Sequence, residues 1–419
     1  MKIAHLSQYF QPKIGYNDLY LPLKQQETGH EVCVITSDRY MPNTRFFGNV
    51  MAERIVGTGT FREEGILTYR LPCLLEIKNV GLLVRGIKKA LSMSKPDVVH
   101  CHDVISTNLI AVAFHKKSLD YAFVADSITG TFHPDKARKM AYLFYKYSLF
   151  PYIANKVDKF IAITDGAQRW LSEEIGVATR RIELIPLGAD MNLFVRNIAR
   201  RKGIRQALGL SDDAVLIVYS GKIIPEKELE VLVQAVSSLP LDLKRKVHML
   251  LVGNGRESYT ERISKLADRQ GLSNKLHLHP AVHRIQLPDY YSSADIAIWP
   301  GTPSNSIIEA MSTELPIIIA KYQSSEQEAQ DTSSLFSYQY DTSNLLEYNN
   351  GLRFSRGSFE QLAKCIEKLA EDEKLRRNMG LEGRRLVEEK LNWNEISKKT
   401  LELYKRILSS HRSDPADIA

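Results

Sequence analysis

Residues 214–232 read AVLIVYSGKIIPEKELEVL, which combines an apolar strand, a glycine, two lysines and the start of a helix. Gly221 lets the backbone approach a ligand closely, and Pro225–Glu226 suits the first turn of the helix. Lys222 and Lys227 put two cations beside that helix start, an arrangement that suits a diphosphate. The same spacing also fits an ordinary strand–loop–helix turn with two solvated lysines.

The strand at 214–219 belongs to a series of short apolar strands that alternate with helical segments. Continuous apolar strands separated by helices indicate parallel sheets covered on both faces. We therefore predict an α/β fold with two Rossmann-like domains, 1–195 and 196–385, followed by helices at 386–412 and a disordered tail at 413–419. The other strands are expected at 1–6, 30–36, 97–101, 122–125, 247–252, 275–278, 296–299 and 316–320, and helices at 82–93 and within 361–408.

Composition narrows the class of protein. The chain has 419 residues, 44% of them hydrophobic, which is enough to form two or three cores and argues against a disordered or fibrous protein. Its four cysteines form no C-x-x-C pair, so we expect neither disulfides nor a zinc site. We find no signal peptide and no run of about 18 apolar residues that could span a membrane. We therefore expect a cytoplasmic protein, at most peripheral to a membrane.

Two further segments carry candidate binding residues. Gly253 lies in LVGNG, where another strand meets a glycine turn, a weak signal that also fits a plain tight turn. Residues 299–316 read WPGTPSNSIIEAMSTELP, and Ser304 or Asn305 is expected to cap the helix that follows. Glu309 lies in that helix among apolar neighbours, which is unfavourable for a carboxylate unless it has hydrogen-bond partners. A carboxylate at a solvated helix edge is the alternative.

Together and in this order, these segments resemble the GT-B glycosyltransferases, in particular the retaining family four. The resemblance covers nearly the whole chain. Its pieces include GHEVCVIT (29–36), KPDVVHCHD (95–103), SGKIIPEKELEVLVQAV (220–236), LLVGNG (250–255), EAMSTELPIIIA (309–320) and LNWNEISKKTLELYKRI (391–407). It implies two domains that face a central cleft, with the last helix crossing back to the N-terminal domain.

The resemblance also assigns roles. Lys222 and Lys227 match the pair that neutralises a donor diphosphate, and Glu309 matches the carboxylate that receives the ribose hydroxyls. Residues 302–306 match the loop that meets the phosphates and the donor sugar, and Gly15 matches a loop that closes over the donor. No metal or other cofactor is implied. The expected donor site comprises Gly15, Gly221, Lys222, Lys227, Gly253, Ser304, Asn305, Ser306 and Glu309.

Three positions depart from the family pattern. Gly301 stands where a first glutamate is usual, and Tyr16 replaces the second glycine of the N-terminal loop. Asp126 stands where a histidine is usual, and it could orient a sugar hydroxyl or accept a proton as a catalytic residue. His133 is an alternative to Asp126, and His102–Asp103 could contact the acceptor.

The function implied is a retaining, metal-independent glycosyltransferase that moves a sugar from a nucleoside diphosphate sugar to a glycan or lipid-linked acceptor, as in cell-surface polysaccharide synthesis. A catalytically silent scaffold that binds sugar nucleotides is the alternative. A sugar-nucleotide epimerase is less well matched, and nucleic-acid binding lacks a recognition module.

Residues 134–159 form a basic segment with six Lys or Arg and two Asp, a net charge of +4. Its apolar side chains Met140, Leu143, Phe144 and Tyr147 follow helical spacing. Such a segment suits peripheral contact with an anionic membrane. We expect this stripe instead to pack into the core.

Overall fold

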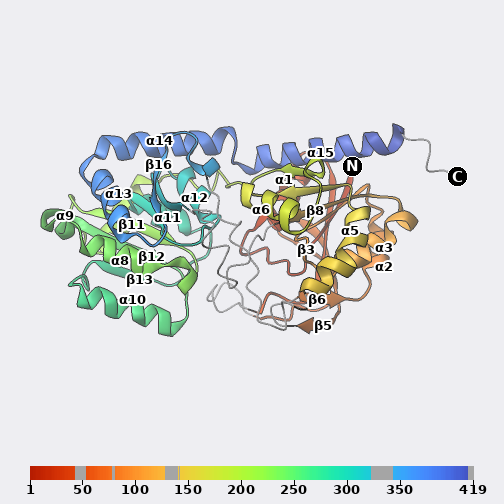
Figure 1. Cartoon of the computed structure of the whole chain (residues 1–419), viewed down its shortest axis with the longest axis horizontal. Helices are drawn as coiled ribbons and strands as arrows, with labels where there is room; N and C mark the ends of the chain where they lie inside the picture. Colours follow the sequence, from red (N-terminus) through yellow and green to blue (C-terminus); the bar gives the residue numbers. More distant parts are fainter. Residues whose placement is uncertain (43–52, 78–80, 128–139, 141, 322–342, 414–419) are drawn as a thin grey trace.

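The computed structural model describes residues 1–42, 53–77, 81–127, 140, 142–321 and 343–413. The predictions for His133, for most of 134–141 and for the tail from 414 lie outside these residues. Figure 1 shows two α/β halves side by side, joined along one edge by the last two helices. The predicted α/β fold with two parallel-sheet domains is confirmed.

The N-terminal half contains a sheet of eight described strands in the order β10-β9-β8-β7-β1-β2-β4-β3. Neighbouring strands are parallel except for β3 and β4 at one edge. The central strands are buried along their length, as expected for a sheet covered on both faces. The strands are β1 (Lys2–Leu6), β2 (Glu31–Ser37), β3 (Gly59–Glu63), β4 (Ile66–Leu71), β7 (Val98–Cys101), β8 (Ala122–Ser127), β9 (Lys159–Ala162) and β10 (Ile182–Leu184).

The C-terminal half contains a sheet of six described strands, all parallel, in the order β13-β12-β11-β14-β15-β16. The segment AVLIVY lies at its centre, between β12 and β14, which explains its unbroken apolar character. The strands are β11 (Val215–Ser220), β12 (Val247–Val252), β13 (Leu276–His279), β14 (Ile296–Trp299), β15 (Ile317–Lys321) and β16 (Gly351–Ser355).

Helices cover both sheets, and the last two connect the halves (Figure 1). α14 packs against α12 and α13, whereas α15 packs against α1, so the chain crosses back at residues 390–392. The expected boundary at 385 falls inside α14. The helices are α1 (Asn17–Glu27), α2 (Ile87–Ser94), α3 (Leu109–Leu119), α5 (Phe150–Lys156), α6 (Asp165–Arg169), α7 (Ile198–Ala207), α8 (Leu229–Ser237), α9 (Leu241–Lys246), α10 (Glu257–Arg269), α11 (Leu287–Ser293), α12 (Ser306–Ser312), α13 (Phe359–Glu371), α14 (Glu373–Glu389) and α15 (Trp393–Ser413).

The predicted helix at 82–93 is wrong in its first part. Residues Gly81–Val84 form β6, which pairs with β5 (Cys73–Ile77) in an antiparallel hairpin. Gly86, with φ of 106°, then turns the chain into α2. A glycine in the left-handed conformation allows one element to end and another to begin. The apolar residues of 82–93 therefore follow helical spacing although they belong to a strand and a helix.

The expectation that the stripe of the basic segment packs into the core is also wrong. Met140, Phe144 and Tyr147 have exposed fractions of 73%, 61% and 70%. The core contacts of this segment come instead from Tyr142 and Phe150, which are buried. Helical spacing identified a continuous apolar face, but it could not tell which of two faces meets the core.

No helix within the described residues combines the length and the apolar character needed to cross a membrane.

Candidate active site

A cavity of about 800 Å³ lies between the two halves and is lined by residues from both. On the C-terminal side it begins at the carboxyl ends of β11 and β12, where ligands of parallel sheets usually bind. On the N-terminal side it is lined by the loop before α1 and by the end of β7. The structure brings all the expected donor-site residues to this cavity, namely Gly15, Gly221, Lys222, Lys227, Gly253, Ser304, Asn305, Ser306 and Glu309.

Lys227, which is buried, and the partly buried Lys222 form a cationic corner of the cavity. The Lys227 ammonium donates hydrogen bonds to the carbonyls of Thr302 (2.8 Å) and Pro303 (3.1 Å), which fix its position. Burial, with a smaller effect from the charge on Lys222, lowers the pKa of Lys227 to about 8. Burial also lowers the pKa of Lys222. The negative charge of Glu226 acts on both lysines and opposes part of this lowering.

Lys227 does not stand at the first turn of a long helix, as the sequence suggested. Pro225–Lys227 forms a short 3₁₀ turn, Glu228 then adopts a left-handed conformation, and α8 begins at Leu229. The kink separates the lysine from the helix. It lets the Lys227 side chain reach the 302–303 loop rather than lie along the helix surface.

Close backbone contacts around this corner require glycine. A Cβ at Gly253 would lie 1.8 Å from the carbonyl oxygen of Gly221. A Cβ at Gly301 would lie 2.5 Å from the Glu226 oxygen and from the Lys227 carbonyl carbon. The absence of a glutamate at 301 therefore has a structural reason, because the backbone that carries Lys227 occupies the space of its side chain.

Glu309, on α12, lines the cavity. Burial raises its pKa to about 7, while the positive charge on Arg284 and a hydrogen bond from Tyr291 oppose this rise. Tyr291 is buried, and its hydroxyl also shares a 2.5 Å hydrogen bond with Ser220 Oγ. The phenol thereby connects the carboxylate to the end of β11.

The expected side-chain cap of α12 is not formed. Asn305 occupies the N-cap position, but its side chain makes no capping hydrogen bond. The Ser304 hydroxyl shares a hydrogen bond with Ser306 instead, and Ser306 Oγ donates to the carbonyl of Ser220 at 3.0 Å. The loop is thus fastened to β11 rather than to its own helix.

Arg284, which the sequence did not single out, connects the halves across the cavity. Its guanidinium lies 4.6 Å from the centroid of the Tyr20 ring on α1 and donates a hydrogen bond to the Tyr20 hydroxyl. Gly15, with φ of +78°, passes beside it, and a Cβ there would lie 2.4 Å from Arg284 Nη1. Arg284 lies in a loop with no recognisable motif, so the sequence held no local signal for it.

Asp126 lies behind the cavity wall rather than on it. His102 and Asp103 line the cavity, and Asp126 accepts hydrogen bonds from His102 Nδ1 (2.6 Å) and the Asp103 amide (2.9 Å). Burial acts to raise the pKa of Asp126, but the charge on His102 and the imidazole hydrogen bonds outweigh it, so the pKa is lowered. Asn17 also donates to Asp126, at 3.4 Å.

Two family models match most of the chain between them. The model described as glycosyl transferases group 1 matches residues 200–386, and that of glycosyltransferase family 4 matches residues 23–193. The chain belongs to the group 1 glycosyltransferases of the GT-B type. Each family model corresponds to one of the two sheets that border the cavity.

Individual relatives of this glycosyltransferase are distant. A D-inositol 3-phosphate glycosyltransferase of Xylanimonas cellulosilytica is 29% identical over 39% of the chain and 40% of its own length. An uncharacterized glycosyltransferase of Methanocaldococcus jannaschii is 23% identical over 65% of the chain and 64% of its own length. These matches therefore span less than two thirds of the curated relatives.

Solved structures resemble the glycosyltransferase over its full fold. A sucrose-phosphate synthase from Thermosynechococcus elongatus aligns with a TM-score of 0.72 at 18% identity, covering 97% of this chain and 99% of that one. HepE from Anabaena in complex with UDP aligns with a TM-score of 0.70 at 17% identity, covering 97% and 100%. At 17–18% sequence identity, this similarity shows a shared fold and nothing about substrates.

Gly301→Ala is expected to destabilise the protein by about 1–3 kcal/mol, because the added methyl group overlaps the backbone at Glu226 and Lys227. The free energy of unfolding in urea measures the change. Gly203→Ala, in α7, is the matched control, since a Cβ there meets nothing within 4 Å. Alanine at 203 should leave stability unchanged or raise it slightly. Equal stability of the two variants would contradict the proposed overlap.

Proposed function

We propose that this enzyme is a retaining glycosyltransferase that transfers a sugar from a nucleoside diphosphate sugar to a glycan or lipid-linked saccharide. The observation that carries the proposal is one cavity that is lined by the cations Lys222 and Lys227 and by the carboxylate of Glu309. A cation pair suits a diphosphate, and a carboxylate suits the two hydroxyls of a ribose. A nucleoside diphosphate presents both groups in one molecule.

The lysines would supply the main chemical assistance. When the glycosidic bond to the donor breaks, negative charge grows on the departing diphosphate, and fixed cations stabilise that charge. Their ammonium groups would do what a magnesium ion does in other transferases, so we propose that the transfer needs no metal. Retention of configuration rests on the family resemblance. HepE structures with UDP and UDP-glucose make UDP the first nucleotide to test.

The N-terminal wall would bind the acceptor. His102 and Asp103 line the cavity on this side, together with Asn17 and Asp18. Asp126, proposed from the sequence as catalytic, is better suited to position His102, because its carboxylate is already engaged by several donors. The Asp126 carboxylate contacts His102 from the side away from the cavity and so holds the imidazole at the wall. Other groups would contact the acceptor.

A silent sugar-nucleotide-binding scaffold is the second candidate. It is favoured by Gly301, because the glutamate that the family uses to contact the donor sugar cannot fit beside the Lys227 backbone. Such a protein would keep Lys222, Lys227 and Glu309 and still bind the nucleotide. Binding and turnover must therefore be measured separately.

The first test is a panel of UDP-, GDP- and ADP-sugars, measured for binding by calorimetry and for slow donor hydrolysis. One nucleotide should bind, and its sugar should be released by the wild type. Lys227→Ala should weaken that binding by about 10- to 100-fold, since a charge-assisted contact is lost. Lys265→Ala, at an exposed lysine of α10, is the control and should bind normally.

The outcomes of the panel separate the candidates. Binding with turnover supports the transferase, and binding without turnover, even when acceptors are supplied, supports the scaffold. Nucleotide affinity that is unchanged by Lys227→Ala would contradict the donor site itself.

The pH dependence of donor kcat/KM should reflect the ionisation of Glu309 and Lys227, whose pKa values are both shifted. Glu309 becomes a carboxylate as pH rises through about 7, and Lys227 loses its charge as pH rises through about 8. Donor kcat/KM should therefore rise and then fall, with a narrow optimum between these values. Lys227→Arg should extend the alkaline limb, because arginine stays protonated. A flat profile from about pH 6 to 9 would contradict these roles.

We further propose that the exposed apolar stripe Met140, Leu143, Phe144 and Tyr147 contacts a membrane that carries a lipid-linked acceptor. Basic residues in the same segment suit anionic lipids. Cosedimentation with anionic vesicles should occur, should weaken with salt, and should decrease in a Phe144→Ser/Tyr147→Ser variant. Vesicle binding that is unchanged by anionic lipid content, by salt and by these substitutions would contradict the proposal.

A further inference from the structure

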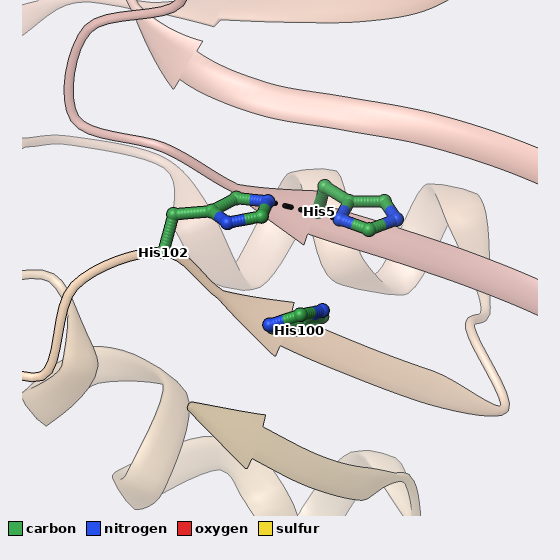
Figure 2. Close-up of side chains that lie close together, drawn as sticks. All are labelled: His5, His100 and His102. Atoms are coloured by element: carbon green, nitrogen blue, oxygen red, sulfur yellow. Dashed lines mark hydrogen bonds between the residues drawn. The ribbon is translucent and has the colours of Figure 1, made fainter. Parts of the chain in front are cut away.

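Three histidines from adjacent strands gather beneath the cavity wall. His5 on β1 and His100 on β7 are direct partners in the parallel register, and His102 follows His100 by two residues. Because alternate residues of a strand point to the same face, all three side chains project from one face of the sheet. Figure 2 shows the His5 and His102 rings joined by a hydrogen bond, with His100 beside them, and all three residues are buried.

The rings offer three nitrogens within a small volume. One nitrogen from each ring can be chosen so that all three lie within 4.8 Å of one another. His5 Nδ1 and His102 Nε2 are 3.0 Å apart. His100 Nε2 lies 3.3 Å from Asp126 Oδ2, and this contact contributes to the lowered pKa of Asp126.

Each ring is also held from outside through its other nitrogen. His5 Nε2 contacts Gln25 Oε1 at 2.7 Å, and His102 Nδ1 contacts Asp126 at 2.6 Å. His100 Nδ1 contacts the Tyr404 hydroxyl of α15 at 2.6 Å. An amide oxygen and a carboxylate only accept hydrogen bonds, so in the neutral rings His5 Nδ1 and His102 Nε2 carry lone pairs that face each other at 3.0 Å. A proton or a metal ion between the two nitrogens would remove this repulsion.

We propose that His5, His100 and His102 bind a divalent transition-metal ion, with Zn²⁺ the first candidate. Histidine ligands in metal sites almost always bond a carboxylate, carbonyl or similar group through the second nitrogen, as these do. Imidazoles favour zinc and its neighbours over Mg²⁺ or Ca²⁺. Nitrogens on one tetrahedral zinc lie roughly 3.4 Å apart, so the widest pair must close by roughly 1.4 Å.

The metal site would stabilise the fold, and it would be separate from the cationic corner formed by Lys222 and Lys227. It would join β1 to β7 and, through Tyr404, tie both to α15, the helix that returns from the other half. His102 lines the cavity, which gives the ion a route of entry. The competing occupant is a proton shared between His5 and His102, and the experiment must distinguish the two.

The test uses the full-length protein, stripped with a chelator and titrated with Zn²⁺ against a chromophoric competitor. One Zn²⁺ per chain should bind and raise Tm. His100→Gln should weaken Zn²⁺ binding at least about 100-fold, and Tyr404→Phe, which keeps all three ligands, about 10-fold. His277→Gln is the control, because it breaks the stacked His248–His277 pair in the other half and should leave the high-affinity ion in place.

Three results would overturn the proposal in favour of the shared proton. They are no stoichiometric Zn²⁺, affinity that is unchanged in both His100→Gln and Tyr404→Phe, and loss of the ion in His277→Gln. Should His100→Gln fail to fold, Co²⁺ in the wild type decides. Strong visible absorption marks a four-coordinate site of this kind, and its absence overturns the proposal.

Discussion

The contact of Tyr20 with both Arg284 and Trp393 sets how the two halves meet. Trp393 stacks on the Tyr20 ring with centroids 5.3 Å apart and an interplanar angle of 11°. Arg284 lies 4.6 Å from the same ring. Stacking and cation–π contacts both depend strongly on distance and orientation. One aromatic ring of α1 therefore receives the loop after β13 from the C-terminal half and the start of the returning helix α15.

This contact has chemical consequences for the cavity. Arg284 also acts on Glu309 and opposes the rise in its pKa, so the same side chain that joins the halves tunes the carboxylate. On the far side, Lys227 is held by the carbonyls of the 302–303 loop, and that loop fits only because position 301 is a glycine. The charges of the cavity are thus fixed by backbone packing.

The sequence predicted the parts of the fold that depend on local patterns. Continuous apolar runs such as AVLIVY located the central strands to within two residues, and the glycine–lysine spacing drew attention to the cationic corner. Strands β3, β4, β9, β10 and β16 and the hairpin β5–β6 were not predicted. Of these, β3 and β5 are largely exposed and lack such apolar runs. The helix predicted over 82–93 failed because a left-handed glycine divides it.

Residues that act across long sequence separations could not be found from local patterns. Arg284 meets Tyr20 over 264 positions, and His100 meets Tyr404 over 304. The three histidines lie on strands whose pairing register brings them together, whereas metal sites are recognised in sequences by short spacings. Asp126 was found, but its place behind His102 depends on how β8 lies beside β7.

A crystal structure with bound UDP tests the central claim most directly. We expect the diphosphate within hydrogen-bond distance of Lys222 and Lys227, and the ribose hydroxyls on Glu309. Density for UDP elsewhere on the molecule, or in the cavity with the diphosphate away from both lysines, would contradict the assignment of this cavity as the donor site.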